Sequence, residues 1–318
     1  MDRMRRLVEA QALNDTPLPC AILQSNVIKS AISALEVSMD QNNVLRRTFA
    51  TQRKYHDLYE QYLLRGINCA INPEDPENPF DAPWKMTHYW HQGADALNIC
   101  LGALIQNRRE PPKAILDLPC GSGRVTRHFR AFFPEATIVA CDLYDYHYNW
   151  CAQHFGAIGQ KSTEHFKDLN FDVKFDLVFC GSLLTHLPED DYKAAIDCIV
   201  RSLSDNGIAI ITLQGRHAEW IQEHKYQFIE PELFKIAMKS VPKTGFGYVD
   251  YNQHWLDSVW KEQSHYGVAM VRPHFATKHI EEDYSVRILG YIERAWDDSQ
   301  DALIIGKPGV NYSAPKEK

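Results

Sequence analysis

Two acids and a pair of glycines, all between residues 117 and 142, carry the clearest chemical signal in this sequence. Asp117 ends an apolar run, Gly121 and Gly123 follow it in a short loop, and Asp142 comes nineteen residues after Gly123. Glycines one residue apart let backbone N–H groups approach a ligand closely, and a helix that begins near Arg124 adds its positive end. An acid at the end of a second buried strand can accept both hydroxyls of a ribose.

The residue at the place of a third glycine separates two cofactors. The spacing of the acids and glycines fits either a nicotinamide dinucleotide or S-adenosylmethionine. A dinucleotide fingerprint has Gly-x-Gly-x-x-Gly around the pyrophosphate, and here the last place holds Thr126. Asp117 would repel a diphosphate, but it can bind an ammonium group or orient the loop. These residues favour the amino-acid end of S-adenosylmethionine.

The segments around the loop alternate between buried strands and amphipathic helices. Apolar, β-branched runs predict strands at 114–117, 137–142, 175–180 and 208–213, and a third strand is expected at 162–166, although that segment is polar. A helical stripe from Tyr192 to Leu203 is predicted to stop at Asp205-Asn-Gly207. Segments 286–292 and 302–306 predict a final hairpin. The pattern is that of an α/β protein with a mostly parallel, doubly wound sheet covered on both faces.

Two stretches lie outside this alternation. Residues 1–110 are predicted to form a helical N-terminal extension, with a proline-rich loop at 71–83 and a helix over 94–105. The core domain is expected at 111–308, with an insertion at 215–283 after the fifth strand and a disordered tail at 309–318. An insertion there lies at the carboxyl edge of the sheet, where ligands bind in open α/β folds. The insertion is either a cap with its own small core or a cap that also forms part of the substrate pocket.

The quoted stretches resemble the successive motifs of one family. The residues Asp117-Leu-Pro-Cys-Gly-Ser-Gly123, Cys141-Asp142, the stretch 175–187 and Gly207 resemble those of class I S-adenosylmethionine-dependent methyltransferases. The resemblance covers residues 112–214 and returns at 286–306. It implies a seven-stranded sheet whose last strand runs antiparallel. Pro119 stands where the family has its first loop glycine, so the first turn of the loop is expected to be stiffer.

The resemblance also implies which residues contact the cofactor. Asp142 would hold the ribose hydroxyls, Leu143 would lie near adenine, and Ser182 would lie beside the sulfonium. The implied cofactor residues come from the ends of the first four strands: Asp117, Pro119, Cys120, Gly121, Ser122, Gly123, Asp142, Leu143, Thr163, Glu164, Cys180, Gly181 and Ser182.

Several histidines are candidates for the acceptor side. His186, six residues after the fourth strand, is either a general base or a cap of the helix that starts near Pro188. A lid over the cofactor is predicted for the segment that holds His88, Tyr89 and His91. Further candidate contacts with the acceptor are two residues of the insertion: His217 and His254. His88 and His91 lack a third ligand at a recognisable spacing, so no metal site is predicted.

Composition limits the acceptor and the compartment. The net charge of −7 over 318 residues opposes broad binding of nucleic acid, so a small-molecule acceptor is expected. No apolar run approaches the roughly 18 residues of a membrane span, and no signal peptide is expected. Eight cysteines without a Cys-x-x-Cys predict buried, reduced thiols in a cytoplasmic protein. Two alternatives stay open: transfer of another group of the cofactor, such as aminopropyl, or a catalytically inactive cofactor-binding subunit. The sequence does not indicate an oligomeric state.

Overall fold

The computed structural model describes residues 50–81, 83–251 and 265–308. The chain divides into two compact units, Met1–Arg53 and Lys54–Lys318. The second unit holds the elements discussed below, including helix α4 (Ala50–Arg65) from Lys54 onward. The predicted tail at 309–318 and residues 1–49 of the predicted N-terminal extension lie outside the described residues.

A seven-stranded sheet forms the centre of the described chain, in the order β3-β2-β1-β4-β5-β9-β8. Its first five strands along the chain pair in parallel: β1 (Ala114–Asp117), β2 (Thr137–Asp142), β3 (Ile158–Lys161), β4 (Phe175–Cys180) and β5 (Leu203–Leu213). The last two form a hairpin: β8 (Arg287–Trp296) and β9 (Gln300–Gly306). β9 runs antiparallel to β5. The predicted mostly parallel sheet with an antiparallel last strand is confirmed.

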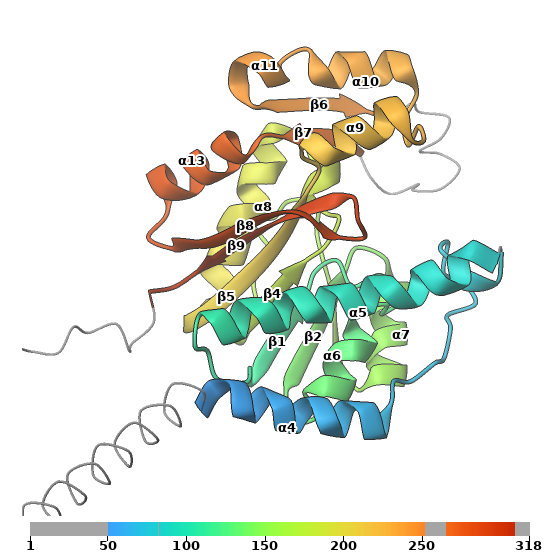
Figure 1. The fold of residues 1–318 in the computed structure, drawn as a ribbon, viewed down its shortest axis with the longest axis vertical. Coiled ribbons are helices and arrows are strands. Elements are labelled where there is room, and N and C mark those ends of the chain that lie inside the picture. Colours follow the sequence, from blue (N-terminus) through green and yellow to red (C-terminus); the bar gives the residue numbers. More distant parts are fainter. Residues whose placement is uncertain (1–49, 82, 252–264, 309–318) are drawn as a thin grey trace, which may run out of the picture. The chain divides into compact units, whose positions relative to one another are not determined.

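Helices cover both faces of this sheet because successive strand residues point to opposite sides. Ile115 and its neighbour Leu116 belong to two different apolar clusters. The cluster of Leu116 includes side chains of α8 (Glu189–Ser202) and α13 (Pro273–Asp283). The cluster of Ile115 includes side chains of four helices, which Figure 1 shows on one side of the sheet: α4, α5 (Pro83–Gln106), α6 (Thr126–Phe132) and α7 (Asp145–Phe155).

The segment between β5 and α13 forms a separate group of elements (Figure 1). Three helices are followed by an antiparallel pair of strands: α9 (Arg216–His224), α10 (Pro231–Met238), α11 (Val241–Thr244), β6 (Phe246–Asp250) and β7 (Gly267–Val271). Phe234, Val249 and Met270 contribute to a small apolar core of their own. β7 contacts the short 3-10 helix η2 (Leu184–His186) that follows β4. A second 3-10 helix, η1 (Pro79–Asp81), precedes α5.

Three predicted boundaries are wrong. The third strand lies at Ile158–Lys161 and not at 162–166, because β3 is the sheet edge and all four of its side chains are at least partly exposed. The helix predicted over 94–105 begins at Pro83, since proline is accepted in a first helical turn. Asp205-Asn-Gly207 lies within β5 and does not end a helix, because the pairing with β4 is irregular between Leu203 and Ile208. None of the described helices combines the length and the apolar character needed to cross a membrane.

Arg127, at the start of α6, joins the glycine loop to more distant segments. The residue is only 1% exposed. It donates to the carbonyl of Gly123 at 2.9 Å, the carbonyl of Asn68 at 3.2 Å, the hydroxyl of Tyr89 at 3.2 Å and the carbonyl of Ser122 at 3.4 Å. One buried side chain thus ties the loop to α5 and to the segment before it.

We expect Arg127→Ala to lower the free energy of unfolding by about 3 kcal/mol or more, because it leaves several buried oxygens without a donor and opens a cavity. Urea denaturation measures this change. Arg216→Ala is the control, because Arg216 forms an exposed ion pair with Glu293 and its loss should change stability little. Equal effects of the two substitutions would show that the buried contacts of Arg127 do not stabilise the fold.

Candidate functional site

The glycine loop folds over the carboxylate of Asp142. The N–H of Gly121 donates to Asp142 Oδ2 at 2.8 Å, and the N–H of Tyr144 donates to Oδ1 at 3.1 Å. Gly121 has a φ of 48° and Gly123 a φ of 81°, values that a side chain rarely allows. The loop also returns to β2, because the N–H of Cys120 donates to the Cys141 carbonyl at 2.9 Å. The glycine loop and Asp142, which the sequence assigned to one cofactor site, are thus in direct contact.

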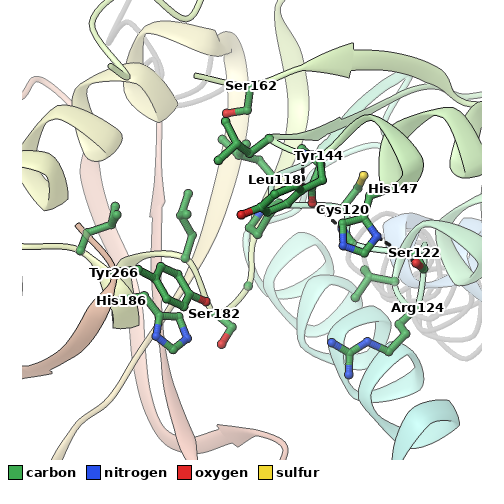
Figure 2. A pocket seen from close by; sticks show the side chains of 18 of the residues that line it. Leu118, Cys120, Ser122, Arg124, Tyr144, His147, Ser162, Ser182, His186 and Tyr266 are labelled. Carbon is green, nitrogen blue, oxygen red and sulfur yellow. Dashed lines mark hydrogen bonds between the residues drawn. The ribbon is translucent and has the colours of Figure 1, made fainter. Parts of the chain in front are cut away.

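A cavity of about 300 Å³ lies beside this loop. Figure 2 shows Cys120, Ser122 and His147 on one side of it, and Ser182, His186 and Tyr266 on the other. The ends of β1, β2, β3 and β4 therefore meet residues that precede β7, and Trp296 at the end of β8 also lines the cavity. Such a cavity has the size of a small-molecule site.

Ten of the thirteen predicted cofactor residues line this cavity: Pro119, Cys120, Gly121, Ser122, Asp142, Leu143, Thr163, Glu164, Gly181 and Ser182. The other three lie outside the lining. Asp117 and Cys180 are buried behind it, and Gly123 contacts the aromatic ring of Phe155. Gly123 therefore has a packing role between the loop and α7, whereas Gly121 faces open space.

Burial controls the charge of both acids. It raises the pKa of Asp142, whereas His147 and the N–H groups around the carboxylate lower this pKa and partly oppose the effect of burial. It raises the pKa of Asp117 to about 7, although the hydroxyl of Thr126 donates to this carboxylate at 2.6 Å and lowers the value. Thr126, the residue in place of a third glycine, is thus the direct partner of Asp117.

His147 is a cavity residue that the sequence did not single out. It is buried, and its Nδ1 lies 2.9 Å from the hydroxyl of Ser122. The side-chain amide of Asn72 donates to the same hydroxyl at 3.2 Å and to the carbonyl of Tyr146 at 3.1 Å. Burial lowers the pKa of His147, which favours a neutral ring. The only sequence signal for it was its place five residues after Asp142.

His186 lies in η2, on the opposite side of the cavity. Its Nδ1 is 2.8 Å from the carbonyl of Gly267, so this nitrogen carries the proton and donates. Its ring stacks on Tyr266 with the centroids 4.5 Å apart. Burial lowers the pKa of His186 to about 4, so the ring is neutral near pH 7. The alternative that His186 caps a helix is wrong, because α8 has no side-chain cap at its start.

The candidate acceptor contacts lie elsewhere. His88, Tyr89 and His91 belong to α5 and do not line the cavity. Tyr89 is 2% exposed and donates to Asp75 at 3.0 Å, which contradicts a contact with the acceptor. His88 lies 3.1 Å from a carboxylate oxygen of Asp297.

The insertion contributes residues other than the ones predicted. His217 stacks on Trp220 in α9, outside the cavity, and His254 lies outside the described residues. His265 and Tyr266 line the cavity in their place. The sequence predicted the insertion but not which of its residues line the cavity. Among the described residues, no group of three or more His, Cys, Asp or Glu side chains could hold a metal ion.

Alanine at the two loop glycines should separate backbone strain from steric overlap. At Gly121 an added Cβ meets nothing within 4 Å, so only the positive φ costs stability, about 1–2 kcal/mol. At Gly123 the Cβ would lie 2.3 Å from the Phe155 ring, which should add about 1–3 kcal/mol. Chemical denaturation of the two variants measures the difference. Equal losses would contradict the packing role of Gly123.

Asp117 should make stability depend on pH. Its ordinary pKa is 3.8 and its folded value is about 7, so between these values the folded protein holds a proton that the unfolded chain has lost. The free energy of unfolding should therefore fall as pH rises through this interval, by on the order of 1.4 kcal/mol per unit. Asp117→Asn should flatten the slope, while Asp172→Asn, an exposed control, should not. Denaturation at pH 5 and pH 8 tests this, and parallel slopes for all three proteins would refute it.

Comparison with known proteins gives a family for the central part of the chain. Residues 115–207 match a family model described as a methyltransferase domain. No curated protein matches the chain.

Three solved structures illustrate the similarity in fold. An S-adenosylmethionine-dependent methyltransferase from Clostridium acetobutylicum has a TM-score of 0.47 at 14% identity, and the match covers 73% of this chain and 100% of that one. The N-methyltransferase NodS from Bradyrhizobium japonicum has a TM-score of 0.44 at 12% identity, and the match covers 80% of this chain and 99% of that one. A 1,6-didemethyltoxoflavin N1-methyltransferase from Burkholderia thailandensis has a TM-score of 0.44 at 12% identity, and the match covers 75% of this chain and 91% of that one.

The family match agrees with the strand order and with the loop between β1 and α6. The predictions of the family, of the enzyme class and of S-adenosylmethionine, the cofactor of that family, are confirmed at this level. Residues 115–207 of this chain thus match a methyltransferase domain, in agreement with the predicted family.

Proposed function

We propose that this chain transfers the methyl group of S-adenosylmethionine to an O, N or C atom of a small molecule bound in the cavity beside the glycine loop. The observation that carries the proposal is the composition of the cavity wall. One cavity joins Gly121 and Asp142 with Tyr266 and Trp296, which come from later parts of the chain. A donor site and an acceptor site must share one space for the methyl group to pass directly between them.

The residues fit the cofactor in two respects. Asp142 is a cavity carboxylate at the end of β2, where the ribose hydroxyls are expected. At Gly121, the space that a side chain would fill is empty of protein atoms, so a ligand can approach the backbone. We propose that residues at the end of β3, Thr163 and Glu164, lie near adenine and that Ser182 lies near the sulfonium.

The charge of the cavity supports a small acceptor over a nucleic acid. Apart from histidines, Arg124 is the one basic residue among the described residues that line the cavity. Five acids line it: Asp75, Glu77, Asp142, Glu164 and Asp191. A polyanion would meet repulsion there, because nucleic-acid sites need basic side chains. Aromatic walls from Tyr144, Tyr266 and Trp296 suit a compact organic molecule.

We propose that His186 contacts the acceptor. Because its Nδ1–H is used by Gly267, the lone pair on Nε2 remains to accept a hydrogen bond, and the low pKa keeps the ring neutral. It would orient an attacking N–H or O–H and take up its proton if the reaction releases one. We also propose that the insertion over 215–283 forms the acceptor side of the site. Residues 1–110 would form a helical extension in front of the core domain.

The buried cysteines support a cytoplasmic location. Six of the seven described cysteines are buried free thiols, in keeping with small apolar side chains in a reducing compartment.

Calorimetry with S-adenosylmethionine tests the cofactor. We expect Asp142→Ala to weaken binding by about 1.5–3 kcal/mol, the contribution of hydrogen bonds to a charged group. Asp172→Ala, an exposed acid away from the cavity, should bind as the wild type does. Wild-type protein that shows no binding at millimolar concentration would refute the proposal. Incubation with methyl-labelled cofactor and fractions of a metabolite extract would then identify the class of acceptor.

A further inference from the structure

Ser182 has an unusual backbone for its residue type. Its φ is 56°, in the left-handed region that glycine and asparagine favour, and it directly follows Gly181 at the end of β4. Ser182 also lines the cavity. A strained residue of this kind persists only where its surroundings fix it, and such residues gather at functional sites.

A closed ring of three hydrogen bonds fixes Ser182. Its N–H donates to the Thr212 hydroxyl at 2.8 Å. The Thr212 hydroxyl donates to Gln300 Oε1 at 2.6 Å, and Gln300 Nε2 donates to the Ser182 hydroxyl at 3.1 Å. The ring joins three strands of the sheet, because Thr212 lies in β5 and Gln300 begins β9.

The direction of each bond in the ring follows from the groups themselves. A backbone N–H can only donate, so Thr212 must accept from Ser182 and direct its own proton elsewhere. That proton goes to the amide oxygen of Gln300, which leaves the amide nitrogen to face Ser182. Every polar group of the ring is therefore satisfied, and Thr212 is fully buried. A satisfied buried network has a single arrangement and resists rearrangement.

The position of the ring links it to the reaction. Ser182 opens the loop that leads into η2, which carries His186, and its hydroxyl also lies 3.5 Å from that of Thr185 in η2. A change at Ser182 would therefore shift both the end of β4 and the residues that face the acceptor. Methyl transfer needs donor and acceptor in line, so a small displacement at this point lowers its rate.

We propose that Thr212 and Gln300 are positioning residues that hold Ser182 in its left-handed conformation against the methionine end of S-adenosylmethionine. The inference rests on the proposed function, because it assigns the ring to the binding of that cofactor. Neither Thr212 nor Gln300 lines the cavity, so both act through Ser182. Their loss should weaken binding of the charged methionine end of the cofactor and leave binding of the adenosine part unchanged.

The test compares two ligands by calorimetry. S-adenosylmethionine carries the amino acid and the positive charge, whereas methylthioadenosine shares the adenosine and the sulfur but lacks both. Thr212→Val removes the hydroxyl at nearly constant shape, and Thr212→Ser retains it. We expect Thr212→Val to raise the dissociation constant of S-adenosylmethionine about tenfold, or about 1.4 kcal/mol, with that of methylthioadenosine unchanged. Thr212→Ser should bind both ligands as the wild type does.

Two further variants keep the test decisive. Ser202→Ala removes another buried hydroxyl, which donates to the Ile199 carbonyl at 2.7 Å in α8, and should leave both dissociation constants unchanged. If Thr212→Val does not fold, Gln300→Ala opens the ring at the partly exposed start of β9 and should weaken S-adenosylmethionine selectively, because Ser182 loses the donor to its hydroxyl.

The outcomes separate this inference from the proposed function. Wild-type protein that binds S-adenosylmethionine, together with a Thr212→Val variant that binds it equally well, would overturn the role of the ring and leave the function standing. Equal weakening of both ligands, or a Thr212→Ser variant as weak as Thr212→Val, would also overturn it. Wild-type protein that does not bind S-adenosylmethionine would remove the proposed function itself.

Discussion

Arg127 donates hydrogen bonds to three carbonyl oxygens and one hydroxyl from inside the protein, where no water can replace it. These partners fix the glycine loop at its second glycine and tie it to Tyr89 of α5, which in turn donates to Asp75. A flexible loop would have to become ordered when it binds a ligand, and that ordering costs conformational entropy. Because the guanidinium fork is rigid, its contacts restrain the loop in advance and reduce this cost.

The loop encloses two acids whose burial is unfavourable without a cation. Burial raises the pKa of both Asp117 and Asp142, so their ionised forms are destabilised in the folded protein. S-adenosylmethionine would bring a sulfonium and an ammonium to this region. The unfavourable burial of the carboxylates and the positive charge of the cofactor would then offset each other. The neutral rings of His147 and His186 add no positive charge that would oppose it.

The cavity wall that holds His186 and Ser182 depends on contacts between distant segments. His186 is oriented by the carbonyl of Gly267 and by the ring of Tyr266, both from the insertion. Ser182, only four residues before His186, is oriented by Thr212 and Gln300. The end of β4 is thus held from two directions, by the hairpin at the sheet edge and by β7. This arrangement explains how an insertion with a small core of its own also takes part in the site.

The sequence by itself determined the features that local chemistry controls. The loop with Gly121 and Gly123, the spacing to Asp142 and the strands at 114–117, 137–142 and 175–180 follow from residues close together in the chain. The edge strand β3 escaped prediction because its exposed side chains show no buried pattern. Only the tertiary structure decided which histidines reach the cavity, since Gly267 lies 81 residues from His186 and Gln300 lies 118 residues from Ser182. Such pairs depend on strand order and packing, which residue types and spacing do not encode.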